Sequence, residues 1–201
     1  MAPRPYKLGR RQASTDETRT RIVDAARALL ADDERAAQFT IDAIAERAGV
    51  ARMTVYYQFA SKRGVLEALF DSLANRGLMP HLAPIFHEPD PRRALDGLIR
   101  AFAAFWNGDR AVLRRARALA ALDREFAASI HARDELRRGH LRSLLERIYI
   151  KGPPRNTPIG TAIDVLHMLT SFETFDALVR EGRTSDDAIG LVRRLAASLL
   201  D

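Results

Sequence analysis

The feature that most constrains the fold is a pair of short helical segments joined by a tight turn at a glycine. Thr40 is a good N-cap, and Phe39 before it can pack on Ile44 as a hydrophobic staple. Gly49 supplies the left-handed residue that ends such a helix. A third helix, expected over residues 51–59, follows almost at once.

The segments on either side complete a recognisable pattern. A first helix is expected to open around Thr15-Asp16, and a fourth at Ser61, which is another good N-cap. The first has a buried stripe at helical spacing, formed by Ile22, Ala25, Ala26, Leu29 and Leu30. Three closely spaced helices, with a tight glycine turn between the second and third, indicate a helix-turn-helix unit.

The third segment predicts a surface for DNA. Val50, Val55 and Phe59 form its inward face. The residues that point elsewhere are Arg52, Met53, Thr54, Tyr56, Tyr57 and Gln58. They combine a guanidinium, an apolar group, hydroxyls and an amide, the types that contact base edges and phosphates in a major groove.

The adjacent tyrosines and the start of the fourth helix fit this interpretation. Tyr56 and Tyr57 point about 100° apart, so one apolar stripe cannot bury both, and both are expected to be exposed and used. Ser61-Lys62 offers free backbone N–H groups and a positive charge, suited to one phosphate. The alternative is that the tyrosines are half-buried packing residues in a unit that binds no nucleic acid.

The stretch from about Ile22 to Leu73 resembles the DNA-binding domain of the tetracycline-repressor (TetR) family of bacterial transcription regulators. The residues that carry the resemblance are Phe39-Thr40-Ile41, Ile44-Ala45-Glu46-Arg47-Ala48-Gly49-Val50, Thr54-Val55-Tyr56-Tyr57-Gln58-Phe59 and Ser61-Lys62. The resemblance implies that Thr40 binds a phosphate, that the six protruding residues face the groove, and that Lys62 holds the DNA backbone.

Two positions depart from the family pattern. Gly64 stands where a capping-box Glu or a better helix former is usual, which predicts a cost of about 0.5–1 kcal/mol in helix propensity. Gln58 occupies a place often taken by His or Tyr, which leaves its partner on DNA open.

Composition narrows the class of protein. The absence of cysteine excludes disulfides and a Cys-ligated metal. The net charge of +6 suggests an acidic partner, but arginine and alanine dominate throughout, so global charge does not discriminate. No apolar run approaches the roughly 18 residues that would span a membrane, so we expect a cytoplasmic protein.

The sequence predicts neither an enzyme nor a cofactor. The histidines show no metal-ligand spacing, so no metal is expected. An all-helical enzyme using His87, Glu88 and Asp90 as acid/base groups is a remote alternative. These three residues lie in a proline-rich segment with no second constellation to position them.

We expect an all-α chain in three parts: a flexible basic arm over residues 1–14, the DNA-binding domain over 15–77, and a helical domain over 78–201. Pro80, Pro84, Pro89 and Pro91 are interpreted as a linker. Amphipathic helices are expected over residues 91–107, 109–122, 123–149, 157–180 and 185–199.

The resemblance implies that the C-terminal helices form a dimer interface. The candidates are Ile159, Ile163, Leu166 and Thr170 on one helix and Ala188, Leu191, Val192, Leu195 and Leu199 on the next. A homodimer is favoured because paired recognition helices must meet successive major grooves about 34 Å apart. The alternative is that both stripes close the core of one subunit.

The resemblance also implies a ligand-binding bundle. Candidate pocket residues are Phe102, Phe105, Trp106, Phe126, His167, Met168, Phe172 and Phe175, each of which is also a plausible core residue. Two sets of arginines share helix faces and are interpreted as solvated: Arg110, Arg114 and Arg117, and Arg133, Arg137 and Arg142.

The leading hypothesis is a homodimeric repressor that binds a partly palindromic operator on double-stranded DNA. A small-molecule effector in the bundle would release it. The alternative is a helix-turn-helix regulator whose bundle binds a protein partner.

Overall fold

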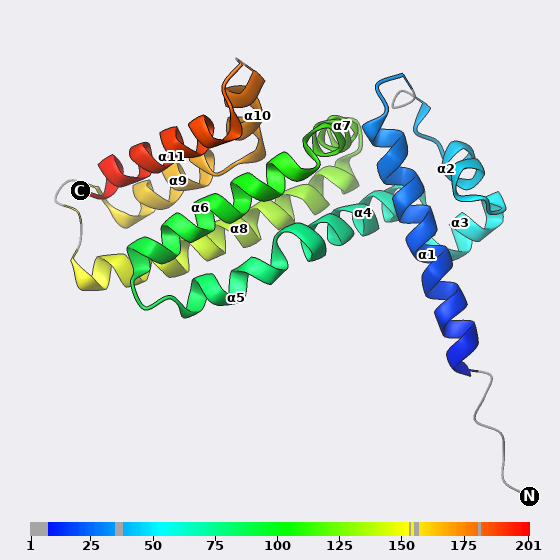
Figure 1. Ribbon diagram of the computed structural model, residues 1–201, viewed down its shortest axis with the longest axis horizontal. Coiled ribbons are helices and arrows are strands. Elements are labelled where there is room, and N and C mark those ends of the chain that lie inside the picture. The colour runs from blue at the N-terminus through cyan, green and yellow to red at the C-terminus, as the bar shows by residue number, and fades with distance from the viewer. Residues whose placement is uncertain (1–7, 35–37, 153, 155–156, 181) are drawn as a thin grey trace, which may run out of the picture. The chain divides into compact units, whose positions relative to one another are not determined.

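The computed structural model describes residues 8–34, 38–152, 154, 157–180 and 182–201 (Figure 1). Within these ranges the chain forms eleven helices and no strand, which confirms the all-α prediction. No helix among the described residues is both long enough and apolar enough to cross a membrane. The chain divides into two compact units, Met1–Ser72 and Leu73–Asp201.

The N-terminal unit contains α1 (Leu8–Ala31), α2 (Ile41–Ala48), α3 (Arg52–Phe59) and the first part of α4 (Lys62–Gly77). α1 packs on α2, and α2 on α3. The predicted stripe of α1 is buried as expected. The next three helices also contribute apolar residues with no exposed surface, among them Ile44, Val55, Val65 and Leu69. This small core fixes the positions of α2 and α3.

α1 begins at Leu8, before the expected start near Thr15. The Thr18 hydroxyl donates a hydrogen bond to the carbonyl of Ser14 (2.8 Å), and Thr20 donates to Asp16 (2.9 Å). These bonds lie inside the helix, so Thr15 is an interior residue and not a cap. The rest of the predicted basic arm, residues 1–7, lies outside the described residues.

The C-terminal unit continues with seven further helices. They are α5 (Met79–His87), α6 (Pro91–Gly108), α7 (Arg110–Ala120), α8 (Arg124–Lys151), α9 (Ile159–Leu169), α10 (Phe172–Arg180) and α11 (Ser185–Leu200). In Figure 1, α6 and α8 run side by side, and α9 and α11 form a second pair along them. α5 lies along α6.

The expected proline-rich linker is mostly the helix α5. Pro80 occupies the first turn, where no backbone N–H is needed, so it does not oppose the helix. Pro84 lies inside α5 and is accommodated there. Asp90 then caps α6 by accepting the N–H of Arg92 (2.9 Å). Proline alone therefore gave the wrong structure for this segment.

The helix expected over residues 157–180 is broken at Thr170 and Ser171 into α9 and α10. Ser171 starts the new helix, since its hydroxyl oxygen accepts the N–H of Thr174 (3.2 Å). The Thr170 carbonyl accepts the indole N–H of Trp106 (3.0 Å), and its hydroxyl accepts from Arg137 (3.0 Å). The break thus satisfies two buried donors from other helices.

The interpretation of the arginines as solvated is wrong for several of them. Arg137 is only 3% exposed and pairs with Asp134 (3.3 Å), and burial lowers its pKa. Arg117 also pairs with Asp134, at 3.1 Å. Arg114 places its Nε 3.1 Å from both carboxylate oxygens of the buried Asp176, and this hydrogen bonding holds the pKa of Arg114 above its usual value.

The pair of Arg114 and Asp176 gives an asymmetric stability prediction. The side chain of Asp176 is 4% exposed and that of Arg114 is 40% exposed. Arg114→Met leaves a buried carboxylate with Arg110 3.9 Å away, and should cost about 3 kcal/mol. Asp176→Asn leaves a guanidinium that water can reach, so its cost should be smaller. Urea unfolding of both variants measures the difference, and equal costs would contradict the burial argument.

Candidate functional site

α2 begins at a side-chain cap. Thr40 has an extended backbone (φ −126°, ψ 161°), and its hydroxyl oxygen accepts the N–H of Ala43 (3.1 Å). This confirms Thr40 as the N-cap. The hydroxyl proton is not used by that bond, so it remains able to donate to a phosphate. Thr40 is exposed, as such a contact requires.

The turn after α2 contains Gly49 in the left-handed backbone conformation, as predicted. Gly49 has φ 63° and ψ 41°, a conformation that other residues adopt only with strain. Its N–H bonds to the carbonyl of Glu46 (3.1 Å), and the next N–H, of Val50, bonds to Ala45 (3.0 Å). These bonds close the end of α2, so α3 starts at Arg52 in a fixed direction.

α3 is anchored by two side chains and presents the rest. Val55 and Phe59 are buried, as predicted. Of the six predicted groove residues, Arg52, Met53 and Tyr57 are exposed, and Thr54, Tyr56 and Gln58 are partly buried. None of the six is in the core. Met53 is 71% exposed and Tyr57 87%, so two large side chains lie at the surface of one short helix.

The two tyrosines differ in their surroundings. Tyr57 projects into solvent, whereas Tyr56 is half-buried and its hydroxyl accepts a long hydrogen bond from Arg52 Nη2 (3.4 Å). Arg52 Nη1 also donates to Asp42 on α2 (3.1 Å). The bond with Tyr56, followed by the attraction of Asp42, holds the pKa of Arg52 above its usual value. Asp42 is a site residue that the sequence analysis missed.

Arg19 of α1 is a second missed residue. Its Nη1 donates to the carbonyl oxygen of Gln58 in the last turn of α3 (3.0 Å), where a cation is favoured by the helix dipole. Its guanidinium carbon lies 4.4 Å from the ring centre of Phe59, within cation–π range. Arg19 therefore attaches the end of α3 to α1.

The turn from α3 to α4 is unusually tight. Ala60 has φ 61° and ψ −33°, and the N–H of Ser61 bonds to the carbonyl oxygen of Phe59 (2.7 Å), as in a γ-turn. The Ser61 hydroxyl oxygen accepts the N–H of Gly64 (3.1 Å), which confirms Ser61 as the N-cap of α4. Lys62 follows as an exposed first residue of that helix.

This turn overturns the interpretation of Gly64 as a poor choice. A Cβ on Gly64 would lie 2.0 Å from the carbonyl oxygen of Phe59 and 3.1 Å from its carbonyl carbon. Both are backbone atoms, so they cannot rotate away. Glycine is therefore required by the turn, whatever it costs in helix propensity.

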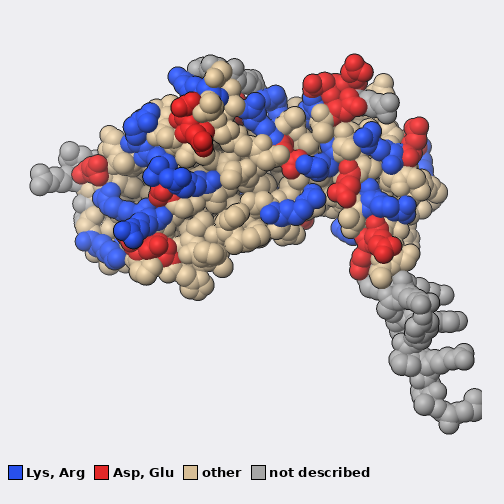
Figure 2. All heavy atoms as spheres, viewed as in Figure 1, with Lys and Arg blue, Asp and Glu red and all other residues tan. Residues whose placement is uncertain are grey.

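Charge alone does not outline a DNA-binding patch. In the face shown in Figure 2, Lys and Arg are interspersed with Asp and Glu over both units. The argument for this site therefore rests on particular residues and not on a single-sign surface.

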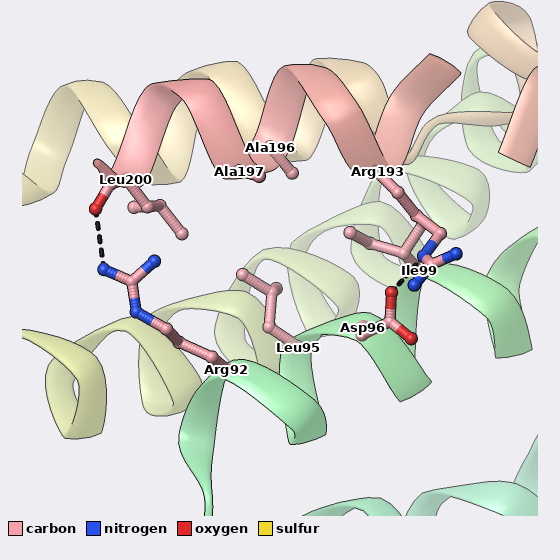
Figure 3. A pocket seen from close by; sticks show the side chains of 8 residues that line it. All are labelled: Arg92, Leu95, Asp96, Ile99, Arg193, Ala196, Ala197 and Leu200. Atoms are coloured by element: carbon pink, nitrogen blue, oxygen red, sulfur yellow. Dashed lines mark hydrogen bonds and ion pairs between the residues drawn. The ribbon is translucent and has the colours of Figure 1, made fainter. Parts of the chain in front are cut away.

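A cavity of about 190 Å³ lies between α6 and α11 in the C-terminal unit (Figure 3). Leu95 and Ile99 project into it from α6, and Ala196 and Ala197 face them from α11. The remaining lining residues are Arg92 and Leu200 at one end and Asp96 and Arg193, which form an ion pair, at the other.

None of the predicted pocket residues lines this cavity. Four of them pack on one another: the ring of Trp106 lies 5.9 Å from Phe102, 4.7 Å from Phe105 and 5.8 Å from Phe172. Arg117 lies over the rings of Trp106 and Phe172, and Arg137 over that of Phe102. Of the other four, Phe126 and Phe175 are buried, His167 is partly buried and Met168 is exposed.

The predicted interface residues also separate into two groups. Those buried within the subunit are Ile163, Leu166, Thr170, Ala188 and Val192. Ile159, Leu191 and Leu199 are partly exposed, and Leu195 is 46% exposed. The stripes therefore close the subunit core for the most part, and α11 keeps a narrower outward row of leucines.

Comparisons with known proteins agree with the geometry. Residues 22–69 match the sequence profile of the bacterial regulatory proteins of the tetR family. No curated protein sequence matches the chain significantly.

Solved structures match the whole fold. A protein from Saccharomonospora viridis, described as a transcriptional regulator and solved with choline, is 16% identical, with a TM-score of 0.75 over 92% of this chain and 98% of its own. A TetR-family protein from Rhodococcus sp. is 15% identical, with a TM-score of 0.73 over 92% and 100%. The fatty acid degradation regulator FadR from Bacillus halodurans is 20% identical, with a TM-score of 0.72 over 89% and 94%.

The helices α2 and α3 are joined by a tight turn at a glycine, and α3 exposes one face to solvent. A separate helical unit follows them. These are the features of a DNA-binding transcriptional regulator of the helix-turn-helix class. Residues 22–69 carry the sequence profile of the TetR family of such regulators, and a solved TetR-family structure shares the fold of the chain. This family is not one of enzymes, in agreement with the sequence analysis.

The crowding at Gly64 predicts whether Gly64→Ala raises or lowers the stability of the fold. In an ordinary helix, Gly→Ala stabilises by about 0.5–1 kcal/mol. Gly64→Ala should instead destabilise by about 1–3 kcal/mol, because the methyl group overlaps the Phe59 carbonyl. Gly139→Ala, where a Cβ on α8 meets nothing within 4 Å, is the matched control and should stabilise. Thermal unfolding measures both, and a raised Tm for Gly64→Ala would refute the geometric requirement.

Proposed function

We propose that the chain acts as a homodimeric repressor. In this proposal, α3 of each subunit enters a major groove of a partly palindromic operator, and a small molecule in the C-terminal unit releases the protein from DNA. The proposed place of action is the cytoplasm. The observation that carries the proposal is the outward face of α3, where Met53 and Tyr57 stand exposed on a helix anchored by Val55 and Phe59.

The proposed DNA contacts divide into two kinds. Thr40 and Lys62, both exposed at helix starts, would bind phosphates, since backbone N–H groups and the helix dipole favour an anion there. Met53, Thr54, Tyr57 and the other outward residues of α3 would contact bases and sugars. The first kind supplies affinity for any DNA, and the second supplies selectivity.

The proposed dimer rests on the exposed part of the predicted stripes. Leu195 is 46% exposed on α11, between the partly exposed Leu191 and Leu199. Met168 on α9, which packs against α11, is 58% exposed. Such a row could bury apolar area in a symmetric contact between two copies. Two heads at a fixed distance are also needed because one recognition helix reads few base pairs.

The proposed effector differs in charge from choline, which the Saccharomonospora viridis protein holds. A quaternary ammonium ion is bound by open aromatic faces. In this chain two arginines already lie over the rings of Phe102, Trp106 and Phe172. Because those ring faces are already covered, a quaternary ammonium ion would find no open face there, so we propose an uncharged or anionic effector.

Two observations favour the alternative of a protein partner. The cavity between α6 and α11 measures about 190 Å³, below the roughly 300 Å³ at which small-molecule pockets usually begin. Large apolar side chains also stand exposed on α8, namely Leu136 at 65% and Ile150 at 85%. If a protein partner replaces the effector, release from DNA should follow addition of that partner and not of small molecules.

The phosphate contact of Lys62 is testable on an operator selected from a random DNA pool. Lys62→Ala should weaken binding to the operator and to unrelated DNA alike, because a phosphate contact carries no sequence information. The slope of log affinity against log salt should fall by about 0.9 per subunit. Lys151→Ala, at the end of α8, is the control and should change neither. An unchanged slope for Lys62→Ala would exclude this contact.

The dimer is testable at Leu195. Leu195→Glu should shift the protein toward monomer, because it brings two carboxylates into a symmetric apolar contact. The variant should keep weak, salt-dependent binding to any DNA and lose operator discrimination. Leu122→Glu, at a leucine that is 89% exposed outside α9 and α11, is the matched control and should remain dimeric. Light scattering measures the oligomer, and a wild-type monomer that still selects its operator would overturn the proposal.

A further inference from the structure

Asp42 carries a negative charge close to the proposed DNA-binding surface, where a negative charge should oppose DNA binding. It lies in the first turn of α2, the helix that precedes the turn into α3, and its side chain is 64% exposed. If α3 faces DNA as proposed, a carboxylate so near the phosphates repels them. A compensating role is therefore expected from its contacts.

The carboxylate holds the guanidinium of Arg52, the first residue of α3. Asp42 Oδ2 accepts from Arg52 Nη1 at 3.1 Å, so the contact bridges α2 and α3. On the other side, Arg52 Nη2 donates to the Tyr56 hydroxyl at 3.4 Å, and the guanidinium carbon lies 5.6 Å from the centre of that ring. The end of a long, flexible side chain is thus held from two helices.

Stability does not account for this arrangement. The side chains of Arg52 and Asp42 are 57% and 64% exposed, and ion pairs in that environment contribute little to folding. A guanidinium has five N–H donors, and the two contacts with Asp42 and Tyr56 use two of them. Three donors remain for a partner outside the chain.

The arrangement instead restricts what Arg52 can bind. An unrestrained arginine at a DNA surface can turn to a phosphate, where it contributes no selectivity. An arginine held at both Nη atoms has fewer orientations open to it, so its remaining donors are presented in a restricted set of directions. The acceptor pair that matches a guanidinium in the major groove is O6 and N7 of guanine.

We infer that Asp42 is a positioning residue which, together with Tyr56, orients Arg52 to read a guanine, so that each operator half-site carries a G·C pair facing the start of α3. This inference rests on the proposed DNA-binding function. It adds Asp42 as a determinant of selectivity and assigns Tyr56 to Arg52 rather than to a phosphate.

Asp42 could also act only on its own helix, because an acid in the first turn favours the helix dipole. Glu46 on α2 provides a matched control, since it is exposed and carries the same charge. Among the described residues, the groups that raise the pKa of Arg52 are Tyr56 and Asp42 and do not include Glu46. Comparing variants of Asp42 and Glu46 therefore distinguishes the loss of Arg52 positioning from the loss of a negative charge.

The test uses the full-length protein and a set of operators in which each half-site position carries each of the four base pairs in turn. Asp42→Ala should reduce the preference for G·C at one position by about fivefold or more, the lower end of what a bidentate contact supplies. Its affinity for unrelated DNA should rise, because a negative charge is lost. Glu46→Ala should raise that affinity similarly and leave the preference at every position unchanged.

A double-mutant comparison isolates the coupling between the two residues. In an Arg52→Ala background, Asp42→Ala should cause no further loss of base preference. Asp42→Asn, which keeps a good helix-start residue and removes the charge, provides the same test if Asp42→Ala unfolds α2. Circular dichroism verifies the fold of each variant.

The inference fails if Asp42→Ala and Asp42→Asn leave the base preference intact, sharpen it, or act equally in the Arg52→Ala background. It also fails if the preferred pair at the Arg52-dependent position is A·T. Failure of the proposed function would look different, because the wild-type protein would then select no DNA sequence from the random pool.

Discussion

The burial of two side chains, Val55 and Phe59, positions the whole outward face of α3. A helix of eight residues is not stable alone, and the N-cap residue Ala51 adds no side-chain hydrogen bond. Its stability must come from packing on α1, α2 and α4. Exposure of Met53 and Tyr57 is possible only because the opposite side of the helix is held so firmly.

Phe59 connects this anchoring both to α1 and to the next helix, α4. Its ring lies under Arg19 of α1, its carbonyl oxygen accepts the N–H of Ser61, and that same oxygen excludes a side chain at Gly64. The start of α4, and with it Lys62, therefore follows from the position of Phe59. The proposed phosphate contact and the proposed groove surface share one structural origin.

Local chemistry explains how much could be predicted from the sequence. The cap at Thr40, the turn at Gly49 and the buried pair on α3 depend on neighbours in the chain, and all were predicted correctly. Contacts between distant residues, such as Arg19 with Phe59, leave no periodic signal and were missed. The same limit explains Arg137: its spacing fits a solvated face, and only the partners at Thr170 and Asp134 show that it is buried.

The enclosed charges of the C-terminal unit also determine how the protein responds to ionic strength. Arg137 is almost fully buried with its partners, and the carboxylate of Asp176 is enclosed beside Arg114. Dissolved ions screen such pairs far less than they screen charges in water. Salt concentrations that release counterion-dependent contacts at a DNA surface are therefore expected to leave these enclosed pairs largely unaffected. Ionic strength should therefore weaken the contacts with nucleic acid well before it disturbs the enclosed ion pairs of the bundle.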